Sequence, residues 1–78
     1  MRRYEDMSRD QIHRVIARER EMLAAIEKYQ VHLASGNGLP RDELSRLQLS
    51  NSRLAEQRNE MIKELEAELA YRDQNGID

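Results

Sequence analysis

The stretch Ser35-Gly36-Asn37-Gly38-Leu39-Pro40 decides the fold of this 78-residue chain. It contains the only proline and two of the three glycines, and helix-forming sequence extends from it on both sides. Glycine readily adopts the left-handed backbone that ends many helices, and proline fits the first turn of a following helix, where its missing N–H costs nothing. The stretch therefore predicts a turn over 35–40 between a helix over 8–34 and a helix over 40–74.

The ends of the two predicted helices carry further signals. Ser8 with Gln11 three residues later has the spacing of a capping box, in which each side chain bonds a free backbone N–H of the other residue. Asp42 and Glu43 follow Pro40, where negative charge is favourable at the start of a helix. Asn75-Gly76 is a typical helix stop. We therefore predict an all-α fold in which residues 1–78 form one antiparallel hairpin domain.

Apolar residues recur at alternating steps of three and four, as in a coiled coil. This spacing predicts one seam on each helix: Ile12, Val15, Glu19, Met22, Ile26, Tyr29 and Leu33 on the first, and Leu44, Leu47, Asn51, Leu54, Arg58, Met61, Leu65 and Glu68 on the second. Folding at the turn places Glu19 opposite Arg58, which predicts a polar layer, because an unpaired charge in a seam is costly. The alternative is that the two side chains reach water independently.

A second apolar line flanks the first and predicts a dimer. It contains Ile16 and Leu23 on the first helix, and Ile62 and Leu69 on the second. If one hairpin leaves this line partly exposed, two hairpins packed together would cover it in a four-helix bundle. Such a small chain also gains stability from association. We expect a homodimer with these four residues in its seam, and the alternative is a wide seam within a monomer.

Composition limits the classes of function. Hydrophobic residues make up 38% of the chain and charged residues 36%, with no cysteine and two histidines. Residues 1–34 carry seven basic and six acidic groups, and residues 35–78 carry six basic and nine acidic groups, so no basic stripe favours nucleic acid. No apolar run approaches a membrane span or a signal peptide. We expect a cytoplasmic protein without a cofactor, a metal or a membrane partner.

No motif points to catalysis. Glu64, Glu66 and Glu68 are spaced by two and would point in different directions from a helix, as solvated carboxylates do. Neither His13 nor His32 has a glutamate three residues before it, so the Glu-x-x-His pattern of helical di-metal sites is absent. We therefore expect a protein that is not an enzyme.

The helix pattern resembles that of a family of small helical-hairpin aspartyl-phosphate phosphatases. The second helix of that family carries Ser-Gln-x-x-Asp, whereas residues 49–54 of this chain read Leu-Ser-Asn-Ser-Arg-Leu, without the glutamine or the aspartate. The resemblance therefore covers the helix pattern only.

Four residues near the turn predict where a partner binds. Val31 and Leu49 fall on the outward sides of their helices, and His32 and Leu39 lie close to them. We expect a small regulator, inhibitor or adaptor that engages a larger protein through this hairpin tip or through a helical face. The alternatives are a factor that inserts its tip into an enzyme channel, a nucleic-acid-binding regulator, and a phosphatase-like hairpin that acts on a phosphorylated regulator.

Overall fold

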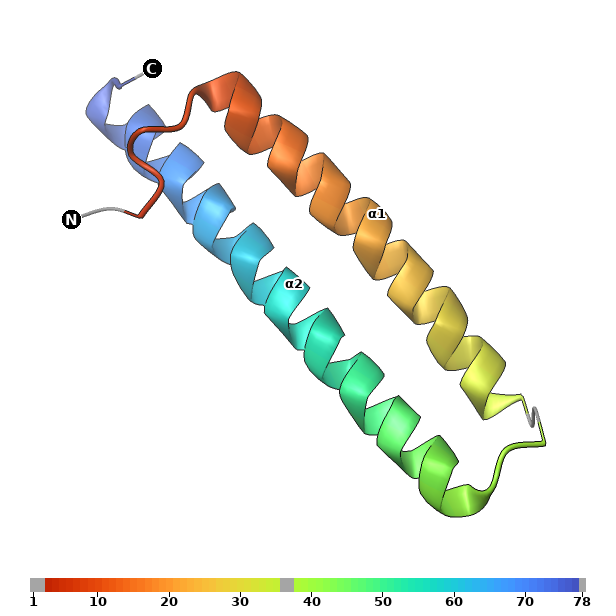
Figure 1. Ribbon diagram of the computed structural model, residues 1–78. Helices are drawn as coiled ribbons and strands as arrows, with labels where there is room; N and C mark the ends of the chain where they lie inside the picture. Colours follow the sequence, from red (N-terminus) through yellow and green to blue (C-terminus); the bar gives the residue numbers. More distant parts are fainter. Residues whose placement is uncertain (1–2, 36–37, 78) are drawn as a thin grey trace.

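The computed structural model describes residues 3–35 and 38–77, and within these ranges the chain is helical with no strand. Helix α1 (Arg9–Ala34) and helix α2 (Arg41–Asn75) run antiparallel, with both chain ends at the same end of the molecule (Figure 1). The molecule measures 54 × 21 × 17 Å. The predicted all-α hairpin is therefore present.

The start of α1 has the geometry that Ser8 and Gln11 predict. The Gln11 N–H donates to Ser8 Oγ at 3.1 Å, and the Ser8 N–H donates to Gln11 Oε1 at 2.8 Å. At the other end, the Ser35 N–H donates to the Val31 carbonyl at 3.1 Å. The prediction that Gly36-Asn37 supplies the turn lies outside the described residues.

The boundaries of α2 differ by one residue from the prediction. Pro40 has an extended backbone (φ −57°, ψ 146°) and precedes the helix, although its carbonyl already accepts the Leu44 N–H at 2.9 Å. At the C-terminus, Gly76 has a φ of 66°, and the Ile77 N–H donates to the Arg72 carbonyl at 2.8 Å. This left-handed cap ends α2 after Asn75.

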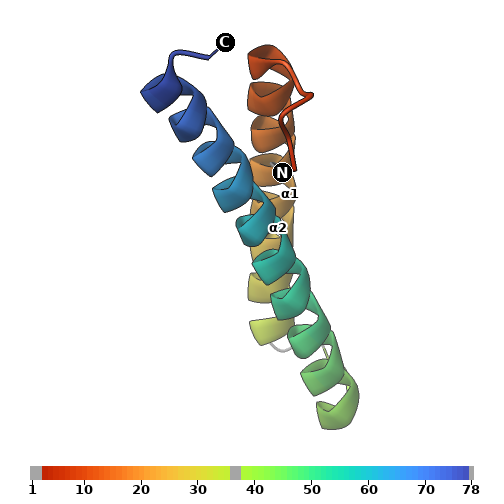
Figure 2. The ribbon, with the colours of Figure 1, turned by 90° about the vertical axis from the view of Figure 1, so that its left-hand side faces the viewer.

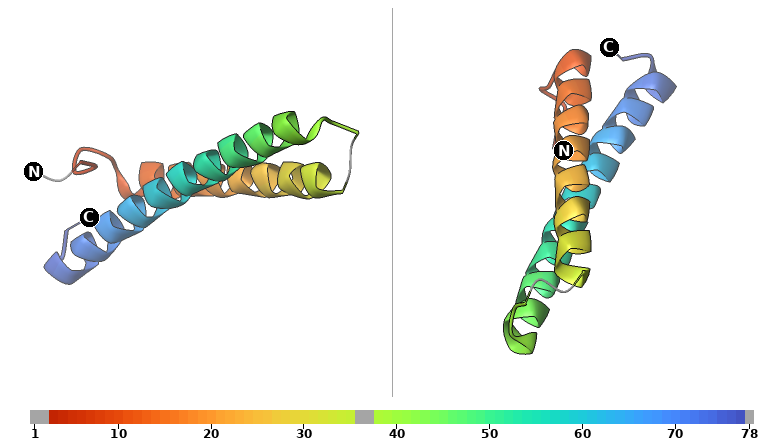
Figure 3. Two further views of the ribbon diagram at one scale, coloured as in Figure 1. Left: turned by 90° about the horizontal axis from the view of Figure 1, so that it is seen from below. Right: turned by 90° about the vertical axis from the view of Figure 1, so that its right-hand side faces the viewer.

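The observed seam contains some residues of the predicted seam and leaves others exposed. Ile12, Leu33 and Leu65 are buried as predicted, together with Ile16 and Ile62. Four other residues of the predicted seam are instead partly exposed: Met22, Tyr29, Leu54 and Met61. From Ile12 onward, the residues of the observed seam are spaced by four and then three positions, whereas the prediction spaced them by three and then four. Each helix is therefore rotated so that its second apolar line faces the other helix. The two helices are inclined to each other along this seam (Figures 2 and 3).

The rotation buries part of the second apolar line within the single hairpin. Only 6% of Ile16 and 7% of Ile62 is exposed, contrary to the expectation that one hairpin leaves them partly exposed. Leu23 and Leu69 pack against the same core cluster and are partly buried. The homodimer seam stays a prediction.

Candidate functional site

A charged pair interrupts the apolar seam at mid-length. Arg58 Nη1 donates to both carboxylate oxygens of Glu19 at 3.0 Å. Glu19 comes from α1 and is buried, with 6% of its side chain exposed, whereas 34% of the Arg58 side chain is exposed. The two helices thus place Glu19 opposite Arg58, as the sequence predicts. The arginine covers the carboxylate from the solvent side.

A second polar contact fixes the register nearer the turn. Asn51 is buried in α2, and its Nδ2 donates to the Ile26 carbonyl at 3.0 Å and to Gln30 Oε1 at 2.8 Å. A buried amide without partners is costly, so these bonds disfavour a slip of one helix along the other. With Glu19–Arg58, they define which residues of the two helices lie at the same height.

The N-terminal segment, residues 3–7, folds back onto the open end of the hairpin and is held there by Arg72. This arginine is 2% exposed. Its Nη2 donates to the carbonyls of Tyr4 (3.0 Å), Glu5 (3.4 Å) and Met7 (2.6 Å), and its Nε donates to Glu68 Oε2 at 2.7 Å. The guanidinium therefore joins α2 to the backbone of a segment more than sixty positions away.

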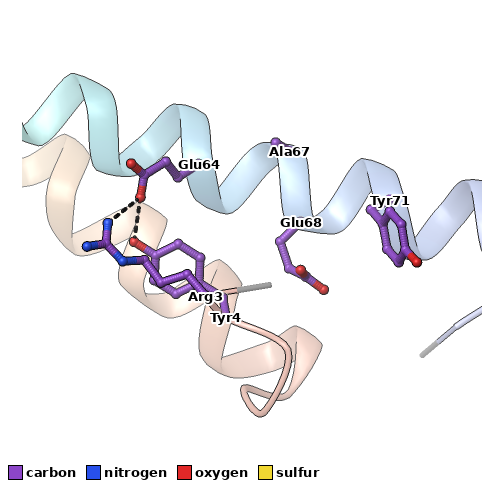
Figure 4. A pocket seen from close by; sticks show the side chains of 6 residues that line it. All are labelled: Arg3, Tyr4, Glu64, Ala67, Glu68 and Tyr71. Atoms are coloured by element: carbon purple, nitrogen blue, oxygen red, sulfur yellow. Dashed lines mark hydrogen bonds and ion pairs between the residues drawn. The ribbon is translucent and has the colours of Figure 1, made fainter. Parts of the chain in front are cut away.

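The side chains of the same segment converge on Glu64 (Figure 4). Arg3 Nη1 and the Tyr4 hydroxyl both donate to Glu64 Oε2 at 2.9 Å. The hydrogen bonds from Tyr4 and then Arg3 lower the pKa of Glu64. Burial, followed by the bond to Glu64, raises the pKa of Tyr4. Glu64 is thus held as an exposed carboxylate in a polar contact.

These residues line an open hollow of about 390 Å³ beside α2. Ala67 and Tyr71 complete its wall, and Figure 4 shows the side chains of Glu68 and Tyr71 following Glu64 along the helix. Its carboxylates already have partners, because Glu64 binds Arg3 and Tyr4 while Glu68 binds Arg72. Within residues 3–35 and 38–77, no group of three or more acidic or histidine side chains could hold a metal ion.

The four residues predicted to bind a partner at the tip are exposed. Val31 is 69% exposed and Leu49 is 55% exposed, and they belong to α1 and α2 respectively. Leu39 lies in the connection before α2. The His32 ring stacks on Tyr29, with ring centroids 6.3 Å apart. The fold brings these residues to the turn end of the molecule, on both helices.

An apolar stripe that the sequence analysis placed in the seam lies on one side of the hairpin. We define the apolar stripe as Met22 and Tyr29 on α1 with Leu54 and Met61 on α2, each between 37% and 44% exposed. Each stripe residue comes directly before a position of the observed seam. In an antiparallel pair of helices, the residues that come before seam positions are turned to the same side of both helices. The stripe residues therefore share one face.

The two faces of the hairpin differ. On the face opposite the stripe, Arg20 pairs with Glu66 at 3.2 Å and Arg9 pairs with Asp73 at 2.9 Å. Tyr4 and Met7 of the N-terminal segment pack against the core cluster, as Val15 does. Arg3 and Tyr4 also line a hollow together with Met61 of the stripe, so the segment adjoins the stripe at the open end.

Comparison with known proteins adds no family. The chain matches no protein-family model, and searches of curated proteins and of solved structures give no significant match. In the described part of the chain, neither helix is long and apolar enough to cross a membrane.

Sequence reasoning missed the function of Arg72 and the docking of the N-terminal segment. The predicted seam includes Glu68, and Arg72 lies four residues further on, but a four-residue spacing is also that of a surface ion pair, so the spacing does not show that the pair is buried. For the N-terminal segment, the available signal was Met7, whose apolar side chain precedes the Ser8 cap and packs against the cluster that contains Ile12. That signal predicts a local contact and not a segment that reaches α2.

Proposed function

We propose that this chain is a non-enzymatic protein-binding module that engages a larger protein through its tip, as a small regulator, inhibitor or adaptor would. The observation that supports this most is the exposure of Val31 and Leu49, the two most exposed large hydrophobic residues described. Neither contributes to the seam, and exposed apolar residues near one end of a molecule favour partner contact.

The electrostatics of the hollow beside α2 favour a binding protein over an enzyme. A general acid or base works best when its pKa lies near the working pH. The pKa of Glu64 is instead lowered by Tyr4 and Arg3. Glu68 is bound to the buried Arg72. Both carboxylates therefore take part in contacts that hold the N-terminal segment and α2 together.

The test is a paired capture experiment with Val31→Glu/Leu49→Glu. We expect this variant to keep the helicity and melting temperature of the wild type, since both side chains are exposed. Its capture of the partner from a lysate of the source cells should fall at least about tenfold, or about 1.4 kcal/mol. Quantitative mass spectrometry of the captured proteins measures the change.

Ala17→Glu/Ala70→Glu is the matched control, because it adds the same charge at exposed positions toward the open end of both helices. It should capture the partner as the wild type does. Undiminished capture by a folded tip variant would contradict the proposal. Loss of folding in the tip variant would place Val31 and Leu49 in the stabilising structure and would contradict it as well.

A further inference from the structure

We infer that the N-terminal segment is a detachable strap, which leaves α2 as a unit while the two helices stay paired, and that the charge of Glu64 controls how often it leaves. Parts of a fold that share few contacts with the rest open separately from it. This inference concerns the open end of the hairpin and does not depend on the proposed function of the tip.

The N-terminal segment is bonded to two side chains of α2. The Arg72 guanidinium donates to three backbone carbonyls of the segment, at distances of 3.0, 3.4 and 2.6 Å. Glu64 accepts hydrogen bonds from Arg3 and Tyr4, both at 2.9 Å (Figure 4). Tyr4 and Met7 also pack against the core cluster, but neither is fully buried. A small set of contacts thus holds the segment, and these contacts can break together.

The polar contacts that pair the two helices lie elsewhere. Arg58 bonds the buried Glu19 at mid-length, and Asn51 bonds the Ile26 carbonyl nearer the turn. The core cluster itself has members on both helices. The two polar contacts involve no residue of the N-terminal segment, so its departure leaves the register of the helices in place.

Arg72 keeps a partner whether the segment is docked or detached. Its Nε donates to Glu68 Oε2 at 2.7 Å, and both residues belong to α2, so this bond does not require the segment. In the docked state, Arg72 Nη1 is buried without a hydrogen-bond partner among the described residues. A buried donor without a partner is costly, and detachment gives this nitrogen access to water. Detachment therefore removes one cost of the docked state.

Glu64 is the charged group through which detachment is controlled. Both bonds from the segment end on the same oxygen, Oε2, and the Glu64 side chain is 43% exposed. The hydrogen bonds from Tyr4 and then Arg3 lower the pKa of Glu64, so the docked state favours its charged form. Hydrogen bonds to a charged acceptor are stronger than those to a neutral one. Loss of this charge should therefore favour the detached state.

Proteolysis after glutamate tests whether the segment opens separately. When opening and closing are fast, cleavage measures the population of the open form. A glutamyl endopeptidase cleaves after Glu5 in the segment and after Glu27 within α1. Each rate is divided by that of a short synthetic peptide with the same site. In the wild type, the normalised rate after Glu5 should exceed that after Glu27 at least about tenfold, and should stay below that of the peptide.

A substitution near the turn separates the two openings. Leu33 is buried at the end of α1 remote from the segment. Leu33→Ala should raise the rate after Glu27, because it weakens the pairing of the helices, and should leave the rate after Glu5 unchanged. Leu33→Val repeats the test if circular dichroism shows that Leu33→Ala does not fold. Parallel increases at both sites would show that the segment leaves only when the hairpin unfolds, and would overturn the inference.

Glu64→Gln tests the control by charge. It should raise the normalised rate after Glu5 at least about fivefold while circular dichroism shows unchanged helicity. Glu60→Gln is the matched control, because it removes the same charge one turn earlier on the exposed side of α2. An unchanged rate in Glu64→Gln, or an equal increase in Glu60→Gln, overturns the control by Glu64. Equal normalised rates after Glu5 and Glu27 in the wild type overturn the separate opening, and a rate after Glu5 equal to that of the peptide overturns the docked state.

Discussion

Glu19 and Arg58 show how a charged pair is placed in a narrow core. The glutamate is buried and depends on the arginine, whereas the arginine is one-third exposed and can reach water. Removing one member of a buried pair leaves an uncompensated charge, while replacing both with apolar residues is often neutral. The two single substitutions should therefore have unequal effects.

We predict that Arg58→Ala lowers the free energy of unfolding by about 3 kcal/mol and that Glu19→Ala lowers it by less, about 1 kcal/mol. Glu19→Leu/Arg58→Met should be close to the wild type. Urea denaturation measures all three. Equal losses from the single variants, with the double variant at their sum, would mean that the pair does not interact.

Glu64 provides a prediction for pH dependence. Its pKa is lowered from the ordinary value of 4.5 by Tyr4 and Arg3. Because the folded-state pKa is the lower one, the contact stabilises the fold above about pH 4.5 and loses that contribution as the pH falls through the folded-state pKa. An NMR titration of the Glu64 carboxyl should give a midpoint below 4.5, and Tyr4→Phe should raise it. A midpoint unaffected by Tyr4→Phe would show that the hydroxyl does not hold the carboxylate.

At the scale of the elements, the N-terminal segment acts as a third packing element beside the two helices. It has no helix or strand of its own, so its position depends on Tyr4 and Met7 against the core and on three carbonyls bonded to Arg72. Arg72 Nη1 is buried without a hydrogen-bond partner among the described residues. The remaining nitrogens of the guanidinium carry the contact.

We predict that Arg72→Lys destabilises the hairpin by about 2–4 kcal/mol, because one ammonium cannot serve Glu68 and the carbonyls together in the planar geometry of a guanidinium. Trypsin should then cleave after Arg3 and Arg9 faster than in the wild type, as the segment leaves α2. Arg53→Lys, at an exposed position on the same helix, is the control and should change neither the stability nor the cleavage rate. Unchanged cleavage in Arg72→Lys would show that the segment is held by its apolar contacts alone.

At the scale of the whole molecule, stabilising contacts are concentrated at the open end. The core cluster of Ile12, Ile16, Ile62 and Leu65 lies there, under the N-terminal segment. Toward the turn, the seam contains the amide of Asn51 and the buried Leu33, while Leu44 and Leu47 are half-buried. The end with the larger core is thus separate from the tip, so a partner that binds the tip need not disturb the main core.

The sequence alone determined the hairpin, its caps and part of its register. Gly and Pro act through local backbone geometry, and capping needs only neighbouring residues, so Ser8, Gln11 and Gly76 could be interpreted without the fold. Ile12, Glu19, Arg58 and Leu65 were also placed in the seam, because they satisfy both possible apolar spacings.

The tertiary structure alone decided which of two apolar lines faces inward. Each line has helical spacing, so periodicity cannot choose between Ile16 and Met22, and the choice depends on how whole side chains of both helices fit together. The docking of residues 3–7 was decided in the same way. The sequence assigns no partner to Arg72, which is buried in the fold with its guanidinium bonded to the distant backbone carbonyls of Tyr4 and Met7. Contacts between segments so far apart in the chain leave no local pattern in the sequence.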